Sequence, residues 1–151
     1  MAVEARLSKH KRNSVILYAI ICLGVAAWFA YDGYLNKDFI TKHTVDGKPD
    51  GTLEGNKKLA PIFLVAAIGF GVYLLMIKNK KVVLGENTLE VDKKVINCDS
   101  IEKIDKTFFD TKGYFIVSYR NQAGVEQNIK ISEQVYDELE PVLENLVSKI
   151  S

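Results

Sequence analysis

The chain has 151 residues, of which 48% are hydrophobic, and its 20 Lys and Arg nearly balance 19 Asp and Glu. This is the length of one ordinary domain. The two cysteines, Cys22 and Cys98, form neither a CxxC motif nor a Cys/His ligand spacing, so the sequence gives no support for a zinc or haem site.

Two segments without a charged residue dominate the sequence. They run from Asn13 to Tyr31 and from Leu59 to Ile77, 19 residues each. As helices, each would reach about 28 Å, close to the roughly 30 Å hydrocarbon core of a bilayer. A helix of a soluble core would carry polar residues on one face, and neither segment does. We therefore predict transmembrane helices over residues 13–31 and 59–77, with Pro61 in the first turn of the second helix.

The first segment also invites comparison with a cleaved signal peptide, because basic residues precede it. Its apolar stretch is longer than the usual ~7–15 residues, and Trp28 would occupy the −3 position of a cleavage after Ala30, where bulky residues are poorly accepted. A retained signal-anchor helix is the better interpretation. The cysteines would then lie one in lipid and one in water, which argues against a disulfide between them.

Lys and Arg near the spans predict the orientation of this membrane hairpin. The N-terminal arm (1–12) contains four cations and the basic junction (78–81) three, against five in the loop (32–58). This bias predicts a cytoplasmic arm, an extracytoplasmic loop and a cytoplasmic C-terminal region. Neither span contains Asp, Glu, Lys, Arg or His, which disfavours an ion or proton pathway. Small residues in both spans favour close packing, either within the hairpin or against a partner's helix.

The loop contains a short stretch, Asp46–Thr52, that resembles a calcium-binding loop. The match fails because Lys48 occupies the third position and Lys57 the twelfth, where a bidentate Glu belongs. Turns formed by Asp and Gly explain the same residues, so no metal is expected here.

Beyond Lys81 the hydrophobic pattern takes the period of two that is typical of β-strands. Gly124 lies in a tight turn between two of these strands and supplies a positive φ where one is needed. The pattern predicts five or six short antiparallel strands. The expected segments are 82–84, 88–92, 95–97, 101–108, 113–120 and 125–131.

A helical pattern follows the strands. Ser132 can cap a helix that has Glu133 in its first turn, and Pro141 is expected to kink it. One stripe of this helix is apolar and is expected to close the open end of the sheet. The stripe consists of Val135, Leu139, Val142, Leu143, Leu146 and Ile150.

The order of strands and terminal helix, directly after a two-helix membrane hairpin, resembles the bacterial pleckstrin-homology-like (PH-like) domains of small membrane proteins. The segments that carry the resemblance are Val83–Leu89, Ile101–Ile104, Gly113–Val117 and the terminal helix. The resemblance implies an α+β domain in a bacterial inner membrane, with an antiparallel sheet or partial barrel of seven strands closed by the helix. We predict that residues 82–151 fold by themselves as this domain. The pattern yields five or six strands, so the seventh is either missing or supplied by another segment.

No catalytic constellation is present, so we expect no catalytic residues, no cofactor and no enzyme activity. The only histidines, His10 and His43, lie in the arm and the loop, on opposite sides of the membrane in the predicted topology. There is no Ser/His/Asp set, Walker loop or GxGxxG motif.

The charge of residues 82–151 limits the classes of partner that this region is expected to bind. Residues 82–151 contain 8 Lys and Arg against 13 Asp and Glu, which argues against nucleic acid and against anionic lipid. Two hypotheses remain: a non-catalytic interaction domain that binds a protein partner or a second copy, such as an accessory subunit of a membrane complex, and a module that senses lipid or a small ligand. A cluster of Lys93, Lys94, Lys103, Lys106 and Lys112 on one face would favour the second. The candidate membrane-surface contacts are Lys78, Lys80, Lys81, Lys93 and Lys94.

Overall fold

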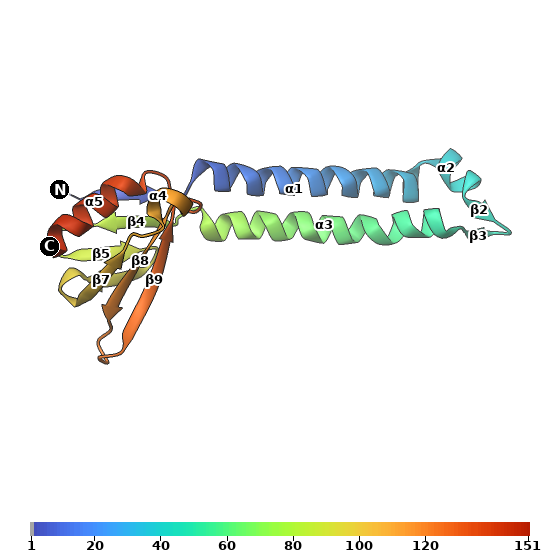
Figure 1. Ribbon diagram of the computed structural model, residues 1–151. Coiled ribbons are helices and arrows are strands. Elements are labelled where there is room, and N and C mark those ends of the chain that lie inside the picture. The colour runs from blue at the N-terminus through green and yellow to red at the C-terminus, as the bar shows by residue number, and fades with distance from the viewer. Residues whose placement is uncertain (1) are drawn as a thin grey trace. The chain divides into compact units, whose positions relative to one another are not determined.

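The computed structural model describes residues 2–151, which divide into two compact units (Figure 1). The first unit, called the domain below, joins the residues up to Arg12 with Ile77–Ser151, and the second, the helical hairpin, is Asn13–Met76. The N-terminal arm, which the sequence pattern treated as a separate segment, therefore belongs to the same unit as the C-terminal region.

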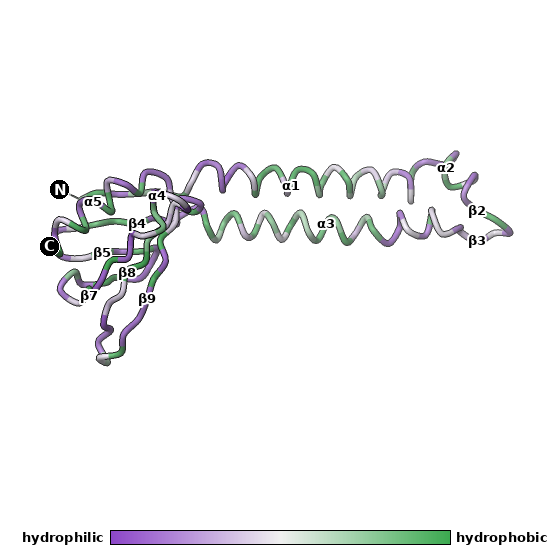
Figure 2. Tube along the Cα trace, in the orientation of Figure 1, coloured by the Kyte–Doolittle hydropathy of each residue, from purple (hydrophilic) through white to green (hydrophobic). Residues whose placement is uncertain are grey.

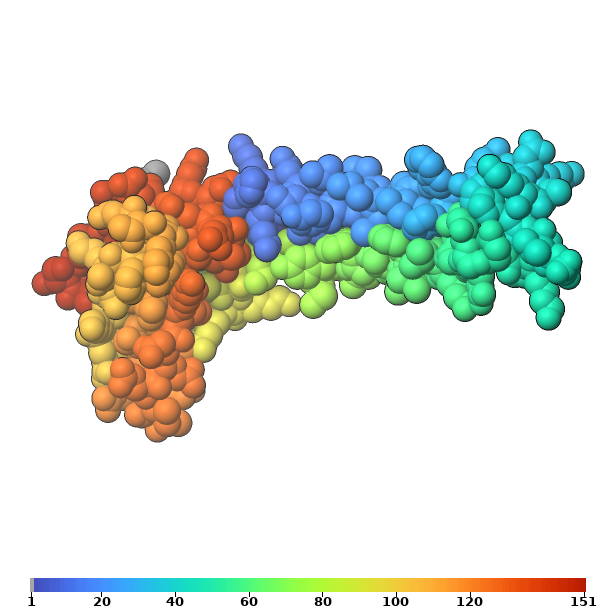
Figure 3. Space-filling model, turned by 45° about the vertical axis from the view of Figure 1, so that its right-hand side comes forward, coloured from blue at the N-terminus to red at the C-terminus, as the bar shows by residue number. Residues whose placement is uncertain are grey.

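Two long apolar helices form the hairpin, α1 (Lys9–Ala30) and α3 (Gly51–Ile77). Figure 2 shows hydrophobic residues along most of both helices, and Figure 3 shows their side chains lying against each other. The rings of Tyr18 and Phe70 are 5.9 Å apart. Most apolar side chains nevertheless point outward, and Ile20 is 61% exposed. Both helices are long and apolar enough to cross a membrane, which confirms that part of the prediction.

Helix α3 begins eight residues earlier than predicted, so Pro61 lies inside it instead of in its first turn. The side chain of Asp50 explains the early start, because its Oδ1 accepts a hydrogen bond from Leu53 N at 2.9 Å and caps the helix. Proline cannot donate to the carbonyl four residues earlier, that of Lys57. The hydroxyl of Tyr34 donates to this carbonyl at 3.1 Å and replaces the missing bond.

Short elements join the two long helices: a π-helical turn (Tyr31–Leu35), α2 (Lys37–Lys42) and the strands β2 (Thr44–Val45) and β3 (Lys48–Pro49). Asp46 and Gly47 form the turn between β2 and β3 with φ of 50° and 76°. Two positive φ values are typical of the type I′ turns that join short hairpins, and this confirms the turn interpretation of the stretch. Within residues 2–151, no group of His, Cys, Asp or Glu is arranged to hold a metal ion.

The domain contains two open antiparallel sheets. The first has the order β1-β4-β5-β6 and the second β7-β8-β9, so the predicted antiparallel strands are confirmed, while a closed barrel is not formed. The strands are β1 (Val3–Arg6), β4 (Lys81–Leu84), β5 (Thr88–Val91), β6 (Lys94–Asn97), β7 (Ile101–Asp105), β8 (Tyr114–Arg120) and β9 (Glu126–Ser132).

Strand β1 is the element that the sequence pattern missed. It pairs with β4 in the register Val3 with Leu84 and Arg6 with Lys81. The side chain of Ala5 is 1% exposed and belongs to the core, whereas Arg6 is exposed. With β1, the two sheets together have seven strands, and the seventh comes from the residues before the hairpin.

Strand β7 is shorter than predicted because Asp105 ends it. Its Oδ1 accepts a hydrogen bond from Thr107 N at 3.0 Å and turns the chain into the short helix α4 (Phe109–Lys112). Gly113 ends α4 in the left-handed conformation at φ 65°, and Gly124 has a φ of 78° in the β8–β9 turn, as expected.

The terminal helix, α5 (Leu139–Ile150), starts later than predicted. Ser132 is the last residue of β9 and therefore does not cap this helix. Pro141 is the third residue of α5, where the backbone N–H has no intrahelical partner, so the expected kink has no cause.

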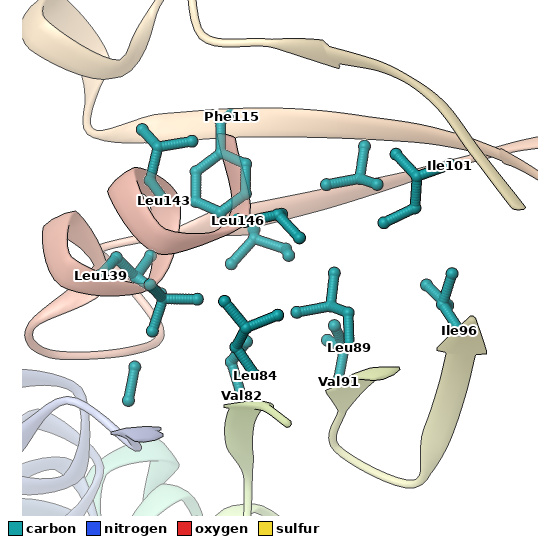
Figure 4. Packing of buried hydrophobic residues seen from close by; sticks show 14 of the residues in the cluster. Val82, Leu84, Leu89, Val91, Ile96, Ile101, Phe115, Leu139, Leu143 and Leu146 are labelled. Atoms are coloured by element: carbon teal, nitrogen blue, oxygen red, sulfur yellow. The ribbon is translucent and has the colours of Figure 1, made fainter. Parts of the chain in front are cut away.

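The predicted apolar stripe of α5 closes the core. Leu139, Leu143 and Leu146 point toward Phe115 of β8 and Leu84 of β4 (Figure 4). All five side chains are at most 5% exposed. The prediction that an amphipathic terminal helix covers the sheets is confirmed.

Candidate basic cleft

An open cleft of about 1060 Å³ lies in the domain, where four segments of the chain meet. They are β1, the first turn of α1, the junction after α3 and the loop before α5. Six cations line the cleft: Arg6, Lys9, Arg12, Lys78, Lys80 and Lys81. Three carboxylates line it as well: Glu4, Asp137 and Glu138. We call this feature the basic cleft.

Asp137 fixes the start of α1 at this cleft. Its Oδ2 accepts a hydrogen bond from the backbone N–H of Lys9 at 2.8 Å, at the helix N-terminus. This bond, together with a bond from the side chain of Ser8, lowers the pKa of Asp137. Ser8 is 3% exposed. A residue from the far end of the sequence therefore caps the helix that leads into the first apolar segment.

Backbone hydrogen bonds hold the four segments together. Leu7 N donates to Lys80 O at 3.1 Å and continues the β1–β4 ladder by one residue. Ser8 N donates to Val135 O at 2.8 Å, and Asp137 N donates to Arg6 O at 2.9 Å. The backbone around the cleft is thus fixed, while the long cationic side chains extend from it.

Two carboxylates form ion pairs with half of the cations. Glu4 pairs with Arg6 at 2.6 Å and with Lys81 at 3.7 Å, and the hydrogen bond from Arg6 is the main cause of its lowered pKa. Lys80 lies 3.4 Å from Asp92, whose other oxygen accepts a 2.8 Å hydrogen bond from the hydroxyl of Tyr136.

The other half of the cations remains available. Within residues 2–151, Lys9, Arg12 and Lys78 form no ion pair. Asp137 is engaged by the backbone of α1. With Glu138 and the neighbouring Asp92 counted as well, six cations face four carboxylates, so the basic cleft keeps an excess of positive charge. Such an arrangement can bind an anion, and phosphate is an anion that lysine and arginine side chains commonly recognise.

The candidate membrane-surface contacts fall into two groups. Lys78, Lys80 and Lys81 line the basic cleft. Lys93 is exposed in the β5–β6 turn, and Lys94 donates to Gln127 Oε1 at 3.2 Å and lies 5.1 Å from the ring centre of Tyr119. Lys94 therefore faces β8 and β9, whereas Lys93 follows Asp92, the ion-pair partner of Lys80, without lining the cleft itself.

Sequence reasoning missed Arg6, Lys9 and Arg12 as site residues, because it counted the arm's cations only as a topology signal. The signal that could have placed them is the alternation of Val3 and Ala5 with Glu4 and Arg6, which is typical of a strand. A four-residue alternation is too short to identify a strand without its partner β4.

The five lysines whose clustering would favour a ligand-sensing module do not lie on one element. Lys103 is on β7 and Lys112 on α4, where its Nζ is 4.8 Å from the ring centre of Phe108. Lys106 lines a second cleft of about 670 Å³ between α4 and α5, together with Asp110, Glu140 and Glu144. This second cleft is mainly acidic.

The histidine of the hairpin has a structural partner. His43 Nδ1 lies 2.7 Å from Asp50 Oδ2, and the same carboxylate caps α3. The hydrogen bond from Leu53 N, followed by that from His43, lowers the pKa of Asp50. His43 therefore holds the carboxylate of Asp50 in the position that caps α3.

Comparisons of the chain with protein-family models, with curated proteins and with solved structures give no match.

Proposed function

We propose that this chain is a non-catalytic, two-span membrane protein that presents a PH-like interaction domain to protein partners at the membrane surface. The pairing of β1 with β4 carries this proposal. The hairpin is inserted between two neighbouring strands of one sheet, so two covalent connections attach the domain to the hairpin. An anchored domain of this kind meets partners in the same membrane at a high effective concentration.

The β1–β4 pairing also supports a topology. The chain leaves β1 and returns to β4 at the same end of one ladder, where Arg6 faces Lys81. If α1 and α3 cross the bilayer, both ends of the hairpin must then lie on the same side. The excess of Lys and Arg in the arm and junction favours the cytoplasmic side.

The seven strands and the terminal helix support the PH-like assignment, and the open sheets support an interaction function. Within residues 2–151, β9 pairs only with β8, so its other edge has unpaired backbone groups. Unpaired edges recruit partners by strand addition. β9 has seven residues, and its side chains Glu126, Asn128 and Lys130 are exposed.

Cysteine labelling tests the topology. Single cysteines at Asn36 and Ser151, in a chain with Cys22 and Cys98 replaced by alanine, are treated with a membrane-impermeant maleimide on intact cells. We expect labelling at position 36 and not at 151. The reverse pattern would show that the domain lies outside, and equal labelling of both would argue against two spans.

Photo-crosslinking in native membranes tests the interaction. A photoreactive amino acid at Asn128 on β9 is compared with one at Asn145, an exposed residue of α5. We expect a discrete adduct from position 128 and none from 145. An adduct of twice the chain mass would identify a second copy as the partner. The absence of any adduct at 128 would contradict the proposed use of this edge.

A further inference from the structure

We propose that the basic cleft binds a phosphate group, supplied by an anionic lipid headgroup or by a soluble phosphate ester. This inference goes beyond the proposed function, which requires only a protein partner. It depends on the convergence of six cations and not on the net charge of residues 82–151, which is acidic.

The first argument is the residual charge. Glu4 is shared between Arg6 and Lys81, and Asp92 lies beside Lys80. Lys9, Arg12 and Lys78 also line the cleft without an ion pair in residues 2–151, as described above. A phosphate offers several strong acceptor oxygens, so more than one cation can bind it at once.

The second argument is the position of these cations in the chain. Arg12 directly precedes Asn13, where the first uncharged segment begins, and Lys78 directly follows Ile77, where the second ends. In a chain that spans the bilayer, both residues fall at the level of the headgroups, because one residue advances a helix by only about 1.5 Å. Lipid phosphate is therefore the nearest abundant anion.

The third argument separates this cleft from an ordinary topology signal. Cations that only set the orientation of a span need to lie near it in sequence, and they need no fixed arrangement in space. Here Arg6 and Lys81 face each other on paired strands, and backbone bonds from the loop before α5 fix the surrounding segments. The side chain of Arg6 is 83% exposed, so it can reorient toward a ligand.

Native mass spectrometry of the full chain in neutral detergent tests the inference. The protein is titrated with dihexanoyl-phosphatidylglycerol, dihexanoyl-phosphatidylcholine and glycerol 3-phosphate. The double variant Arg12→Gln/Lys78→Gln removes two unpaired cations of the cleft. The matched control, Lys103→Gln/Lys106→Gln, removes the same charge from β7 and from the segment before α4, outside the basic cleft.

We expect phosphatidylglycerol to bind more tightly than phosphatidylcholine. The cleft variant should weaken its binding about 30-fold, at about fivefold per cation near a membrane surface. The control should change binding less than twofold, and Arg12→Lys/Lys78→Arg should retain it. If glycerol 3-phosphate binds equally well and is lost in the same variant, the ligand is the soluble ester. Equal losses in the cleft variant and the control, or no binding of any of the three probes, would overturn the proposal.

Circular dichroism and the labelling rate of the buried Cys98 thiol show whether the cleft variant is folded. A folded variant that keeps wild-type affinity for phosphatidylglycerol would also overturn the proposal. This result would leave the protein-partner function untouched, because the crosslinking at β9 does not involve the cleft.

Discussion

At the scale of single residues, side chains satisfy backbone groups that the helices leave without partners. Asp137 accepts from the N-terminal N–H of α1, Asp50 caps α3, and Tyr34 donates to the carbonyl that Pro61 leaves free. The sequence separation of the partners is 3 residues for Asp50 and Leu53, 23 for Tyr34 and Lys57, and 128 for Asp137 and Lys9. Such contacts fix where helices begin and how a proline is accommodated.

Replacing Asp137 with alanine should destabilise the domain by about 0.5–2 kcal/mol, the usual cost of losing a helix cap. The stability is measured by labelling the buried Cys98 at increasing urea concentrations, in a Cys22→Ala background. Glu126→Ala, on the exposed face of β9, is the control and should be neutral. An equal loss in both variants would show that Asp137 does not cap α1.

The stability difference between the wild type and Asp137→Ala should decrease as the pH falls. The pKa of Asp137 is lower in the folded domain than its ordinary value of 3.8, because Lys9 N and Ser8 donate to the carboxylate. Its stabilisation is therefore fully present above that ordinary value and is lost as the pH falls through the folded value. The stability difference between wild type and Asp137→Ala should be constant at pH 5–7 and shrink below about pH 4. A difference that grows in acid would contradict this assignment.

Replacing Tyr34 with phenylalanine should loosen α3 around Pro61, because the carbonyl of Lys57 loses its donor. A net hydrogen-bond contribution of about 0.5–1.5 kcal/mol corresponds to roughly 2- to 13-fold faster local hydrogen exchange, measured by mass spectrometry. The effect should disappear in a Pro61→Ala background, where residue 61 regains its N–H. Tyr31→Phe removes a neighbouring hydroxyl and serves as the control.

At the scale of secondary-structure elements, α5 is the element that joins the two sheets into one core. Its buried side chains contact residues of β4 and β8, which belong to different sheets. Lys149 also donates to the carbonyls of Gly85 and Glu86, at 2.5 and 2.6 Å, after β4. The C-terminal end of the helix is therefore attached to the first sheet as well.

Replacing Leu146 with alanine should destabilise the domain by about 2–5 kcal/mol, because Leu146 is fully buried and its loss leaves a cavity. Glu144→Ala, on the exposed side of the same helix, should change stability by less than about 0.5 kcal/mol. Urea titration with Cys98 labelling compares the two. Similar values for both variants would mean that α5 contributes little to the core.

At the scale of the whole molecule, the domain is interrupted in sequence by the hairpin. Residues 82–151 lack β1, so without the arm the outer edge of β4 is unpaired and the position of Ala5 in the core is empty. The expectation that residues 82–151 fold by themselves therefore needs revision. The folding unit that the structure indicates includes residues 2–7, which contain β1.

Excising the hairpin tests this conclusion. Replacing residues 8–79 with Asn-Gly joins Leu7 to Lys80, which are already hydrogen-bonded, through the dipeptide preferred in two-residue hairpins. The resulting protein should be soluble, with dispersed amide NMR signals, whereas residues 82–151 alone should be poorly folded. Ala5→Asp in the excised protein is the matched control and should abolish folding. A stable fold of residues 82–151 alone would show that β1 is dispensable.

The sequence by itself determined the features that depend on local pattern. Uncharged segments of membrane-spanning length predict long apolar helices. A hydrophobic period of two predicts strands, and the apolar stripe that follows predicts the covering helix. Tertiary structure decided the rest. Strand β1 needs β4, the start of α1 needs Asp137, and the basic cleft needs both, because each depends on residues that are distant in sequence. Charge counts along the chain placed Arg6 and Lys81 in separate segments, and only strand pairing brings them into one cleft.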